Sequence, residues 1–372
     1  MTETVTPAFP PITDRLLDWY DRRSRTLPWR GDPDPYRVWV SEIMLQQTRV
    51  ETVIPYFERF TAALPDVASL AVVSEDRLLK LWEGLGYYSR ARNLQNAARL
   101  IMERHGGRLP ADPGELTKLP GIGEYTAGAV ASIAFGIPVP AVDGNVLRVT
   151  ARLTADTSDA GGTAFRRSVA VRLRPLIPAD RPGDFTQALM ELGALVCLPG
   201  RAARCTECPL ARDCRAYREG RPEAYPVRVR LPARRIEPRT AIVLCSPAGI
   251  LVRRRPATGL LAGLWEFPHV GGTLDESDAR AAAAAWGARP GTAVRLPERT
   301  HVFTHLEWRL TGYRFTSPAF DPPAGWRWVT PDGLRGEYAV PAAFAPWFGV
   351  LSEEGRDCGM MGIPDPDRRE DP

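Results

Sequence analysis

The amino-acid sequence predicts two domains, an all-α domain followed by a smaller α/β domain. At 372 residues the chain is too long for one typical hydrophobic core. Apolar residues recur at helical spacing up to about residue 221, whereas short alternating segments typical of strands begin after residue 239. Between the two patterns, residues 222–238 are rich in Pro and Arg and predict a linker.

The composition is that of an ordinary soluble globular protein, with 44% hydrophobic and 25% charged residues. The longest apolar runs fall short of the roughly 18 residues that a membrane-spanning helix needs, and the N-terminus lacks a charged-then-apolar signal pattern. We therefore expect a cytoplasmic protein. We also expect disorder in residues 1–11 and in the tail 351–372, which holds three Arg against seven acidic residues.

Basic residues are concentrated in one segment. The formal net charge is only +4, but residues 201–235 hold ten Arg against four acidic residues. Almost all basic residues are Arg, since Lys occurs only at positions 80 and 118. A local excess of guanidinium groups indicates a surface that binds phosphates.

A glycine-rich turn organises the all-α domain. Residues 115–118 end one predicted helix, and Pro120 prevents its continuation. Gly121 and Gly123 permit a tight reversal into an apolar helix over residues 124–135. N–H groups left bare at a helix N-terminus bind anions, and a nucleic-acid phosphate is the anion expected here. Taken alone, the motif is equally compatible with an ordinary turn between helices.

An aspartate follows this turn at the start of another predicted helix. Asp143 precedes a helical pattern that begins at Asn145, and Asp is a favoured N-cap residue. A carboxylate that accepts N–H bonds at a helix start stays ionised and is suited to stabilising a cationic transition state. The capping and catalytic interpretations are compatible.

Four of the six cysteines form one cluster, with the spacing Cys197-x7-Cys205-x2-Cys208-x5-Cys214. In a cytoplasmic protein, such a cluster predicts a metal centre rather than disulfides. Spacing alone leaves zinc as the generic alternative.

Together these residues resemble the helix-hairpin-helix DNA glycosylases of the endonuclease III superfamily, and most closely the MutY-type adenine DNA glycosylases. The resemblance covers about residues 12–345. It implies a monofunctional base excision repair enzyme that binds duplex DNA as a monomer, associated with the nucleoid. Its substrate would be adenine opposite 8-oxoguanine or guanine, which is flipped out and released by hydrolysis of the N-glycosidic bond.

The resemblance also assigns catalytic roles. Residues 41–48 reproduce the motif SEIMLQQT without change, and its glutamate, Glu42, is implied as the general acid. Burial raises the pKa of a carboxyl, so that it holds a proton near neutral pH. Asp143 is implied to stabilise the sugar cation, with Tyr125 and Asn145 in support. Outside the family motif, a lone helical Glu is more often a solvated surface residue.

Contacts with the base and with DNA follow from the same resemblance. Arg25, Leu27 and Trp29 are implied to line the pocket for the extruded adenine. Glu191 is implied to contact its amino group, with an exposed helix position as the alternative. Gln46 and Gln47 would enter the duplex, Tyr87 would wedge beside the opposite base, and Gly121 and Gly123 would hold a phosphate.

In these enzymes the spacing C-x6-C-x2-C-x5-C binds a [4Fe–4S] cluster. The resemblance therefore implies that cofactor for Cys197, Cys205, Cys208 and Cys214. This chain has one more residue between the first two cysteines. We expect the extra residue to bulge outward without moving the ligands.

Residues 239–350 resemble the Nudix-like C-terminal domain of the same enzymes. Hydrolytic Nudix domains hold magnesium through a run of glutamates, but here those places are Ala281–Ala285, so nucleotide hydrolysis is not expected. Phe303-Thr304-His305 instead resembles the Phe-Ser-His loop that inspects 8-oxoguanine, with Thr304 retaining the hydroxyl.

Other functional classes fit the sequence less well. An endonuclease III-like glycosylase/lyase needs a Schiff-base lysine two positions after the second hairpin glycine, where this chain has Tyr125. A noncatalytic iron–sulfur DNA-binding protein would not need Glu42 and Asp143. The alanine helix argues against a Nudix hydrolase.

Overall fold

The computed structural model describes residues 9–228, 233–345 and 347–348. The predicted disorder of residues 1–11 is wrong at its end, because Phe9 is buried in the core of the first unit. Residues 1–8 and the acidic tail lie outside the described residues. Residues 1–72 and 92–231 form one compact unit, and residues 73–91 and 232–372 form a second. Each unit is described by itself.

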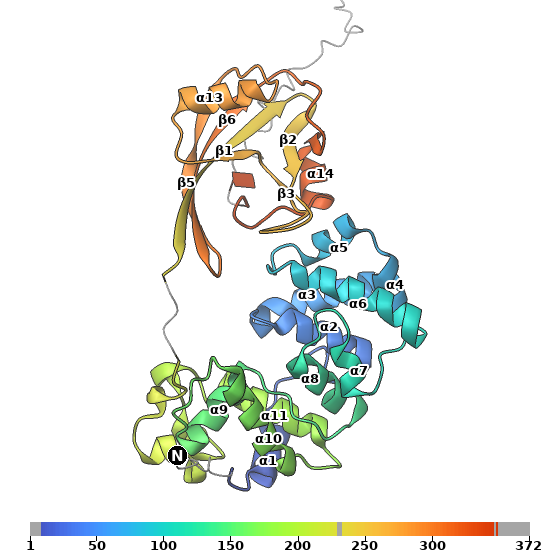
Figure 1. Ribbon diagram of the computed structural model, residues 1–372, viewed down its shortest axis with the longest axis vertical. Helices are drawn as coiled ribbons and strands as arrows, with labels where there is room; N and C mark the ends of the chain where they lie inside the picture. The colour runs from blue at the N-terminus through green and yellow to red at the C-terminus, as the bar shows by residue number, and fades with distance from the viewer. Residues whose placement is uncertain (1–8, 229–232, 346, 349–372) are drawn as a thin grey trace, which may run out of the picture. The chain divides into compact units, whose positions relative to one another are not determined.

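The first unit is all-α, as predicted (Figure 1). None of the described helices is long and apolar enough to cross a membrane. The α-helices are α1 (Thr13–Arg23), α2 (Pro35–Leu45), α3 (Val50–Ala63), α4 (Val67–Val72), α6 (Ser89–His105, which begins in the second unit), α7 (Pro113–Thr117), α8 (Glu124–Phe135), α9 (Gly144–Thr154), α10 (Thr163–Leu173), α11 (Pro182–Leu195) and α12 (Arg215–Arg218). Short 3-10 turns are η1 (Arg174–Leu176), η2 (Gly200–Ala202), η3 (Cys205–Glu207), η4 (Ala211–Asp213) and η5 (Pro222–Ala224).

Aspartate caps define where three of these helices begin. Asp34 accepts a hydrogen bond from the Arg37 N–H before α2, and Asp143 accepts one from Val146 before α9. Asp112 does the same for α7, the first helix of the hairpin. Each cap satisfies an N–H group that has no partner inside its helix, so the sequence fixes the start of the helix locally.

Helices α9 and α11 pack tightly against each other and share one hydrophobic core with α1. Their approach depends on Gly193, because a Cβ atom built at this position lies only 2.5 Å from the Cβ of Asn145. Real side chains essentially never come that close. The glycine therefore sets how near α11 lies to the N-terminal end of α9.

The second unit is an α/β domain built on one mixed sheet, to which residues 73–91 add helix α5 (Glu75–Trp82). The strand order is β3-β2-β1-β6-β5, with β4 also paired to β1 and β7 to β2; β1 and β6 run parallel. The strands are β1 (Arg235–Ser246), β2 (Gly249–Arg254), β3 (Trp265–Glu266), β4 (His269–Gly271), β5 (Ala293–Val302), β6 (Leu306–Thr316) and β7 (Trp326–Val329), and the helices are α13 (Glu276–Ala285) and α14 (Pro331–Gly336).

Separate cores cover the two faces of the sheet. Helix α13 packs through Ala279 and Ala283 on one face, against Ile242 and Leu244 of β1 (Figure 1). The other face carries a larger, aromatic-rich core that includes Trp308. Of the residues Ala281–Ala285, where a hydrolytic Nudix domain is expected to carry glutamates, only Ala283 is buried, and Ala281, Ala284 and Ala285 are exposed.

The predicted linker is shorter in the structure. Residues 235–238 belong to β1. At the other end Tyr225 is buried in the core of the first unit, and its carbonyl accepts a hydrogen bond from Arg152. The proline content predicts a free segment, but β1 holds its C-terminal end and the buried side chain of Tyr225 lies near its N-terminal end.

Candidate active site

A cavity of about 430 Å³ lies in the first unit between the loop after α1 and helices α2, α8, α9 and α11. It gathers residues that the sequence separates by more than a hundred positions. All eight of the predicted catalytic and base-pocket residues of this unit line it: Arg25, Leu27, Trp29, Glu42, Tyr125, Asp143, Asn145 and Glu191. Gln46 and Gln47 lie beside it at the end of α2 and are not among the lining residues.

Glu42 is a buried carboxyl on α2, with only 5% of its surface exposed. The hydroxyl of Tyr125, in the first turn of α8, donates a hydrogen bond to its Oε2 atom. Burial raises the pKa of Glu42 to about 7, and the charge of Asp143 adds to the rise, although Tyr125 and Arg30 oppose it. A carboxyl with this pKa is an effective proton donor near neutral pH.

Asp143 is held at the N-terminus of α9. Its Oδ1 accepts from the Val146 N–H (2.6 Å), and its Oδ2 accepts from the Asn145 side chain (2.8 Å). Burial raises the pKa of Asp143 above its usual value, while these bonds and the charge of Arg148 lower it. The expectation that Asp143 stays ionised rests on these bonds alone, whereas burial has the larger, opposite effect on its pKa.

Glu191 corrects a second expectation, since the alternative of an exposed helix position is wrong. Only 1% of its surface is exposed. Arg25 donates to it through its backbone N–H, Nε and Nη2 (2.8–2.9 Å), and Arg30 adds another bond of 2.8 Å. Despite burial, these hydrogen bonds and the charge of Arg30 lower the pKa of Glu191 to about 2. Glu191 therefore fixes two arginine side chains of the cavity wall.

The hairpin between α7 and α8 has the geometry that its glycines predict. Gly121 adopts a left-handed φ of 77°, where a side chain would be strained and would also meet Asn93. Gly123 caps α8 without a side-chain hydrogen bond, and a Cβ built on it meets nothing within 4 Å. The first N–H groups of α8 therefore face an open approach, as an anion site requires.

Two residues expected to enter the duplex share an uncommon backbone. Gln47 (φ 58°) and Tyr87 (φ 48°) are among four non-glycine residues with left-handed φ in the described chain. Both are exposed, and Tyr87 exposes 47% of its surface. Such conformations cost about 1–3 kcal/mol each and cluster at functional sites.

In the second unit, the predicted recognition loop Phe303-Thr304-His305 (the FTH loop) joins β5 to β6. The Thr304 hydroxyl lies 3.2 Å from the hydroxyl of Tyr87, which belongs to the same unit. The ring of Phe303 packs edge-on against buried Trp308, with centroids 5.0 Å apart. One side of the loop is thus anchored in the core while Thr304 stays exposed.

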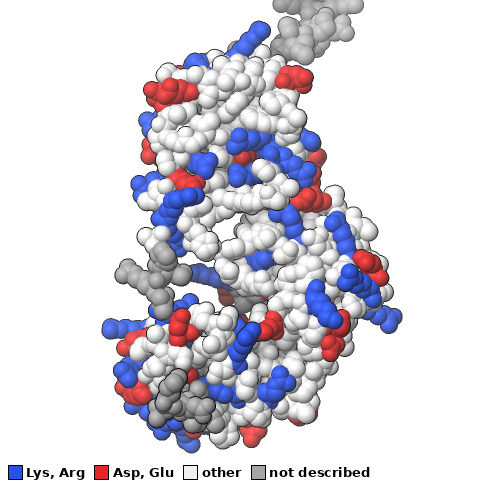
Figure 2. All heavy atoms as spheres, viewed as in Figure 1, with Lys and Arg blue, Asp and Glu red and all other residues white. Residues whose placement is uncertain are grey.

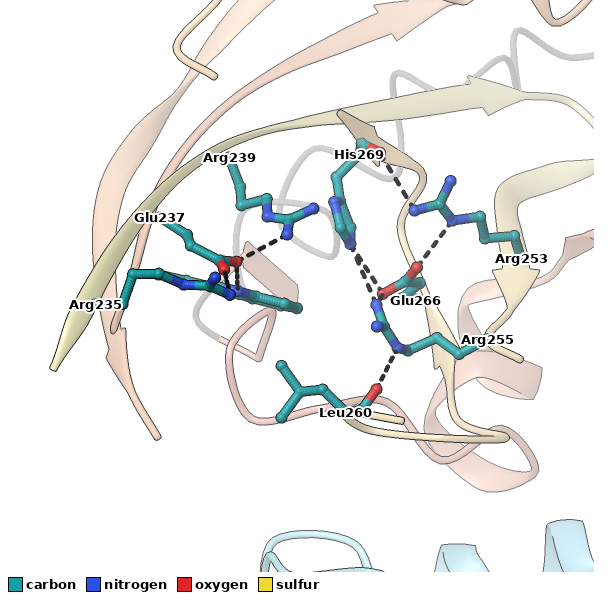
Figure 3. Close-up of polar contacts among 9 residues, drawn as sticks. Arg235, Glu237, Arg239, Arg253, Arg255, Leu260, Glu266 and His269 are labelled. Carbon is teal, nitrogen blue, oxygen red and sulfur yellow. Dashed lines mark hydrogen bonds and ion pairs between the residues drawn. The ribbon is translucent and has the colours of Figure 1, made fainter. Parts of the chain in front are cut away.

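A charged network lies around Trp308, whose ring contacts Arg239, Arg255 and His269. Figure 3 shows the polar contacts of this network. Glu266 binds Arg253 (2.8 Å), Arg255 (2.6 Å) and His269 (3.1 Å). On β1, Glu237 binds Arg239 and accepts a hydrogen bond from the Trp308 indole. Although burial opposes it, the hydrogen bond from His269 and the charges around Glu266 lower its pKa to about 2. The network therefore pairs its carboxylates with cations around Trp308, the residue on which Phe303 of the FTH loop packs.

Comparisons with known proteins match both units. Residues 40–175 match the family model of the HhH-GPD superfamily base excision DNA repair proteins, and residues 239–348 match that of the NUDIX domain. The chain is 38% identical to the adenine DNA glycosylase of Mus musculus, over 85% of this chain and 73% of the relative. It is 35% identical to that of Buchnera aphidicola subsp. Baizongia pistaciae, over 78% and 82% respectively.

The chain belongs to the adenine DNA glycosylase family.

It is therefore a base excision repair enzyme that binds DNA and acts on N-glycosyl bonds of adenine. Among solved structures, a thermostable thymine-DNA glycosylase aligns with 56% of this chain and 95% of its own, with a TM-score of 0.50 and 27% identity. The helical fold is thus shared with glycosylases of another base specificity. The cavity, rather than the fold, must select adenine.

The four clustered cysteines of this adenine DNA glycosylase lie around η3 and η4. Burial raises the pKa of Cys208 to about 12, and the nearby charges of the other three cysteines contribute to the rise. Arg152, buried beneath them, donates to the Cys197 sulfur (3.3 Å). Among the described residues, no group of three or more His, Cys, Asp or Glu side chains is placed to hold a single metal ion.

Arg148 connects this cysteine loop with the N-terminal end of α9, where Asp143 lies. Its Nε donates to the Cys197 carbonyl (2.7 Å), and its Nη2 donates to the Asn145 side-chain carbonyl (2.8 Å). Asn145 in turn binds Asp143. A continuous chain of hydrogen bonds therefore runs from the backbone of Cys197 to the cavity carboxylate.

Three arginines of the site were not singled out from the sequence. Arg30 belongs to the motif RTLPWR, but its partner is 161 residues away. Arg148 and Arg152 follow Asn145 on one face of α9, and that helical spacing was the available signal. The basic segment 201–235 also has acidic neighbours, and on the face in Figure 2 basic and acidic side chains are interspersed over the first unit.

Proposed function

We propose that this enzyme removes adenine from pairs with 8-oxoguanine or guanine in duplex DNA, as a monofunctional glycosylase that leaves an abasic site. The observation that carries the proposal is the pairing of two buried carboxyls in one cavity. Glu42 has a pKa of about 7, and Asp143 is fixed by hydrogen bonds from Asn145 and Val146. An acid and a stabilising carboxylate are the groups that a glycosidic cleavage needs.

In the proposed mechanism, the adenine leaves the base stack and enters the cavity beside Glu42. Because Tyr125 donates to Oε2 of Glu42, the Oε1 atom is left to carry the proton to N7 of the purine. Protonation makes adenine a better leaving group, and the glycosidic bond breaks with oxocarbenium character at the sugar. Asp143 stabilises this cation, and water then adds to C1′ and gives a proton to the Glu42 carboxylate, which lost its own proton to N7.

The scarcity of lysine supports a water nucleophile. A lyase forms a Schiff base between an amine and the sugar, and this requires a lysine in the cavity. The chain has only Lys80 and Lys118, and neither lines the cavity. Lys118 is exposed and paired with Glu115. Strand cleavage by a lysine-bound intermediate is therefore not expected.

Recognition of the opposite base is assigned to the FTH loop together with Tyr87. 8-Oxoguanine differs from guanine by a hydrogen on N7 and an oxygen on C8. The Thr304 and Tyr87 hydroxyls lie 3.2 Å apart and both donate and accept, so they suit that edge. A lost hydrogen bond of this kind costs about 1–3 kcal/mol, enough for a preference of roughly tenfold to a hundredfold.

We further propose that Cys197, Cys205, Cys208 and Cys214 hold a [4Fe–4S] cluster. A four-iron cluster binds its thiolates at separate corners, so its ligands need not converge on one point as those of zinc do. Arg152 supplies an N–H donor and positive charge beside Cys197. When bound, the cluster would cross-link residues 197–214 through four iron–thiolate bonds.

Single-turnover excision from duplexes with adenine opposite 8-oxoguanine, guanine and thymine tests the proposal. We expect the rate to fall in that order, with no strand cleavage before alkali is added. Equal rates opposite 8-oxoguanine and thymine would refute the proposed specificity. For the cofactor, anaerobically purified protein should be brown and contain about four irons per chain. If the protein contained one zinc per chain and no iron, the iron–sulfur assignment would be wrong and the four cysteines would form a zinc site.

A further inference from the structure

Lys80 is an exception to the composition of this chain, because it is one of only two lysines among 48 basic residues. It lies on α5, in the segment 73–91 that forms one unit with the C-terminal sheet. Only 12% of its side chain is exposed. An ammonium on a side chain with so little exposure needs specific hydrogen-bond partners inside the protein.

The Lys80 ammonium uses its donors on three oxygens. It binds the carbonyls of Leu334 (3.3 Å) and Tyr338 (3.1 Å) at the end of α14, and the Glu83 carboxylate (2.6 Å). Carbonyls at the end of a helix lack partners within it, which makes them available to a cation.

Glu83 completes the connection from the other side. Its Oε1 accepts a hydrogen bond from the backbone N–H of Val340 (2.7 Å). Lys80 and Glu83 together therefore bind backbone groups at three positions of residues 334–340. The same segment is tied to the sheet, because the Trp265 N–H donates to the Ala339 carbonyl (3.0 Å).

The first turn of α5 adds contacts to the sheet domain. Asp76 pairs with Arg254 (3.2 Å) and accepts a weak hydrogen bond from the Trp265 indole (3.4 Å). These groups are considerably more exposed than Lys80, since the side chains of Asp76 and Arg254 are 46% and 37% exposed. Solvent weakens exposed ion pairs, so the Lys80–Glu83 pair is the stronger attachment.

Geometry explains why this residue is Lys and not Arg. An ammonium directs three hydrogens from one compact centre, and it can reach two carbonyls and a carboxylate at once. A guanidinium is planar and wider, and its donors point outward in a fixed fork. Arginine at position 80 would therefore lose at least one of the three contacts.

We propose that Lys80 and Glu83 form a latch that holds residues 73–91 on the sheet domain and thereby keeps Tyr87 beside Thr304. The latch makes Lys80 a positioning residue for recognition of the opposite base, and this role rests on the proposed function. Tyr87 lies seven residues after Lys80, on a left-handed backbone, and its hydroxyl meets Thr304 only while the segment stays attached.

The experiment compares Lys80→Arg and Lys80→Met with Lys118→Arg, a matched control at an exposed lysine that pairs with a Glu in the same way. The measured quantity is the ratio of single-turnover rates on adenine opposite 8-oxoguanine and opposite guanine. We expect both Lys80 variants to lower this ratio about tenfold through lost buried hydrogen bonds, while Lys118→Arg keeps it. Unchanged ratios in both Lys80 variants would overturn the latch.

A double-mutant cycle tests whether the effect passes through Thr304. If the latch acts by holding Tyr87 at this hydroxyl, Lys80→Met should add little to the loss of preference caused by Thr304→Val. Fully additive losses would show that Lys80 does not act through Thr304 and would overturn the positioning role.

Hydrogen exchange gives a readout that does not depend on base preference. The Val340 amide is protected by Glu83, so Glu83→Gln and Lys80→Met should both speed exchange in the peptide that contains Val340. If the parent enzyme did not prefer 8-oxoguanine but amide exchange at Val340 was still faster in the variants, the proposed base specificity would be refuted and the latch would be supported. If amide exchange in both variants were as slow as in the parent enzyme, the latch proposal would be refuted.

Discussion

The two units bury glutamates in opposite electrostatic settings. In the first unit, Glu42 has a tyrosine hydroxyl as its hydrogen-bond partner, and its pKa rises to about 7. In the second, Glu266 is equally buried but binds two arginines and a histidine, and its pKa falls to about 2. Burial alone therefore does not decide the protonation state. The number of cations within hydrogen-bonding distance of the carboxyl decides whether it is protonated.

The same difference between a cation-paired and an unpaired buried carboxyl occurs inside the cavity, between Glu191 and Glu42. It lies in the wall beside Glu42, yet two arginines hold its pKa at about 2. With their pKa values of about 2 and about 7, Glu191 is suited to a structural role as a carboxylate, whereas Glu42 is suited to exchanging a proton near neutral pH. A buried carboxyl without a bound cation is the better candidate for chemistry.

The largest expected effect is a loss of excision rate on substitution of Glu42 or Asp143, but not of the arginine-paired Glu266. Glu42→Gln or Asp143→Asn should reduce the single-turnover rate by at least about a hundredfold, since each removes an acid or a charge from the cavity. Glu266→Gln, the matched control, should leave excision opposite guanine within about tenfold of the parent. A Glu42 or Asp143 variant that remained within tenfold would lose its catalytic role.

Substitutions of Glu191 and Glu42, two carboxyls of the cavity, should change the free energy of unfolding in opposite directions. Glu191→Gln leaves two arginines without their buried partner and should cost about 3–5 kcal/mol in the free energy of unfolding. Glu42→Gln should instead stabilise at pH 8. The folded pKa of about 7 lies above the usual 4.5, so ionised Glu42 opposes folding by up to about 3 kcal/mol there. Urea denaturation at pH 8 measures both.

The pH profile of stability checks the sign of that second effect. Because the pKa of Glu42 is raised, its contribution is favourable below about pH 4.5 and is lost as pH rises through 7. The free energy of unfolding of the parent should therefore fall between pH 4.5 and pH 7, and Glu42→Gln should lack this fall. If parent and variant fell equally across this window, Glu42 would not carry the raised pKa.

A smaller effect concerns the hydroxyl that lowers the pKa of Glu42. Excision should decline as pH rises through about 7, because Glu42 must be protonated. Tyr125→Phe removes a hydrogen bond that favours the ionised form and should move this decline to higher pH. Single-turnover rates from pH 5 to 9 provide the test, and a shift to lower pH would contradict the assignment.

The smallest expected effect lies in the second unit. Phe303→Ala with His305→Ala should reduce the preference for 8-oxoguanine over guanine by about tenfold, because the loop loses its anchor on Trp308 and a polar side chain. The rate opposite guanine should change little. If the parent and the double variant showed the same preference, discrimination would lie outside the FTH loop.

Much of this organisation was predictable from the sequence. The change of hydrophobic period predicts an all-α and an α/β part, but it places residues 73–91 in the all-α domain, whereas they form one unit with the sheet. Helix α8 matches its predicted bounds, since a glycine turn begins it and Gly136, in a left-handed conformation, ends it. The motifs around Glu42 and Asp143 likewise identified the cavity carboxyls. In each case the information is local: caps, turns and short motifs act within a few residues.

Distant pairings were not predictable. Arg30 meets Glu191 across 161 residues, and Lys80 meets Leu334 across 254. Nothing beside Glu191 in the sequence indicates a cation, so its burial and its pKa depend on how α11 packs in three dimensions. The same holds for Asp143, where neighbouring residues predict the hydrogen bonds but not the burial that opposes them.

Gly193 implies a class of inactivating mutation that leaves the catalytic groups intact. One added methyl group there collides with Asn145 and must displace the start of α9, which carries Asp143. The hairpin glycines lie outside this contact, so such a protein would still be able to settle on DNA while releasing no base. A variant of that kind would occupy lesions without repairing them, and it would interfere with intact copies of the enzyme rather than merely being absent.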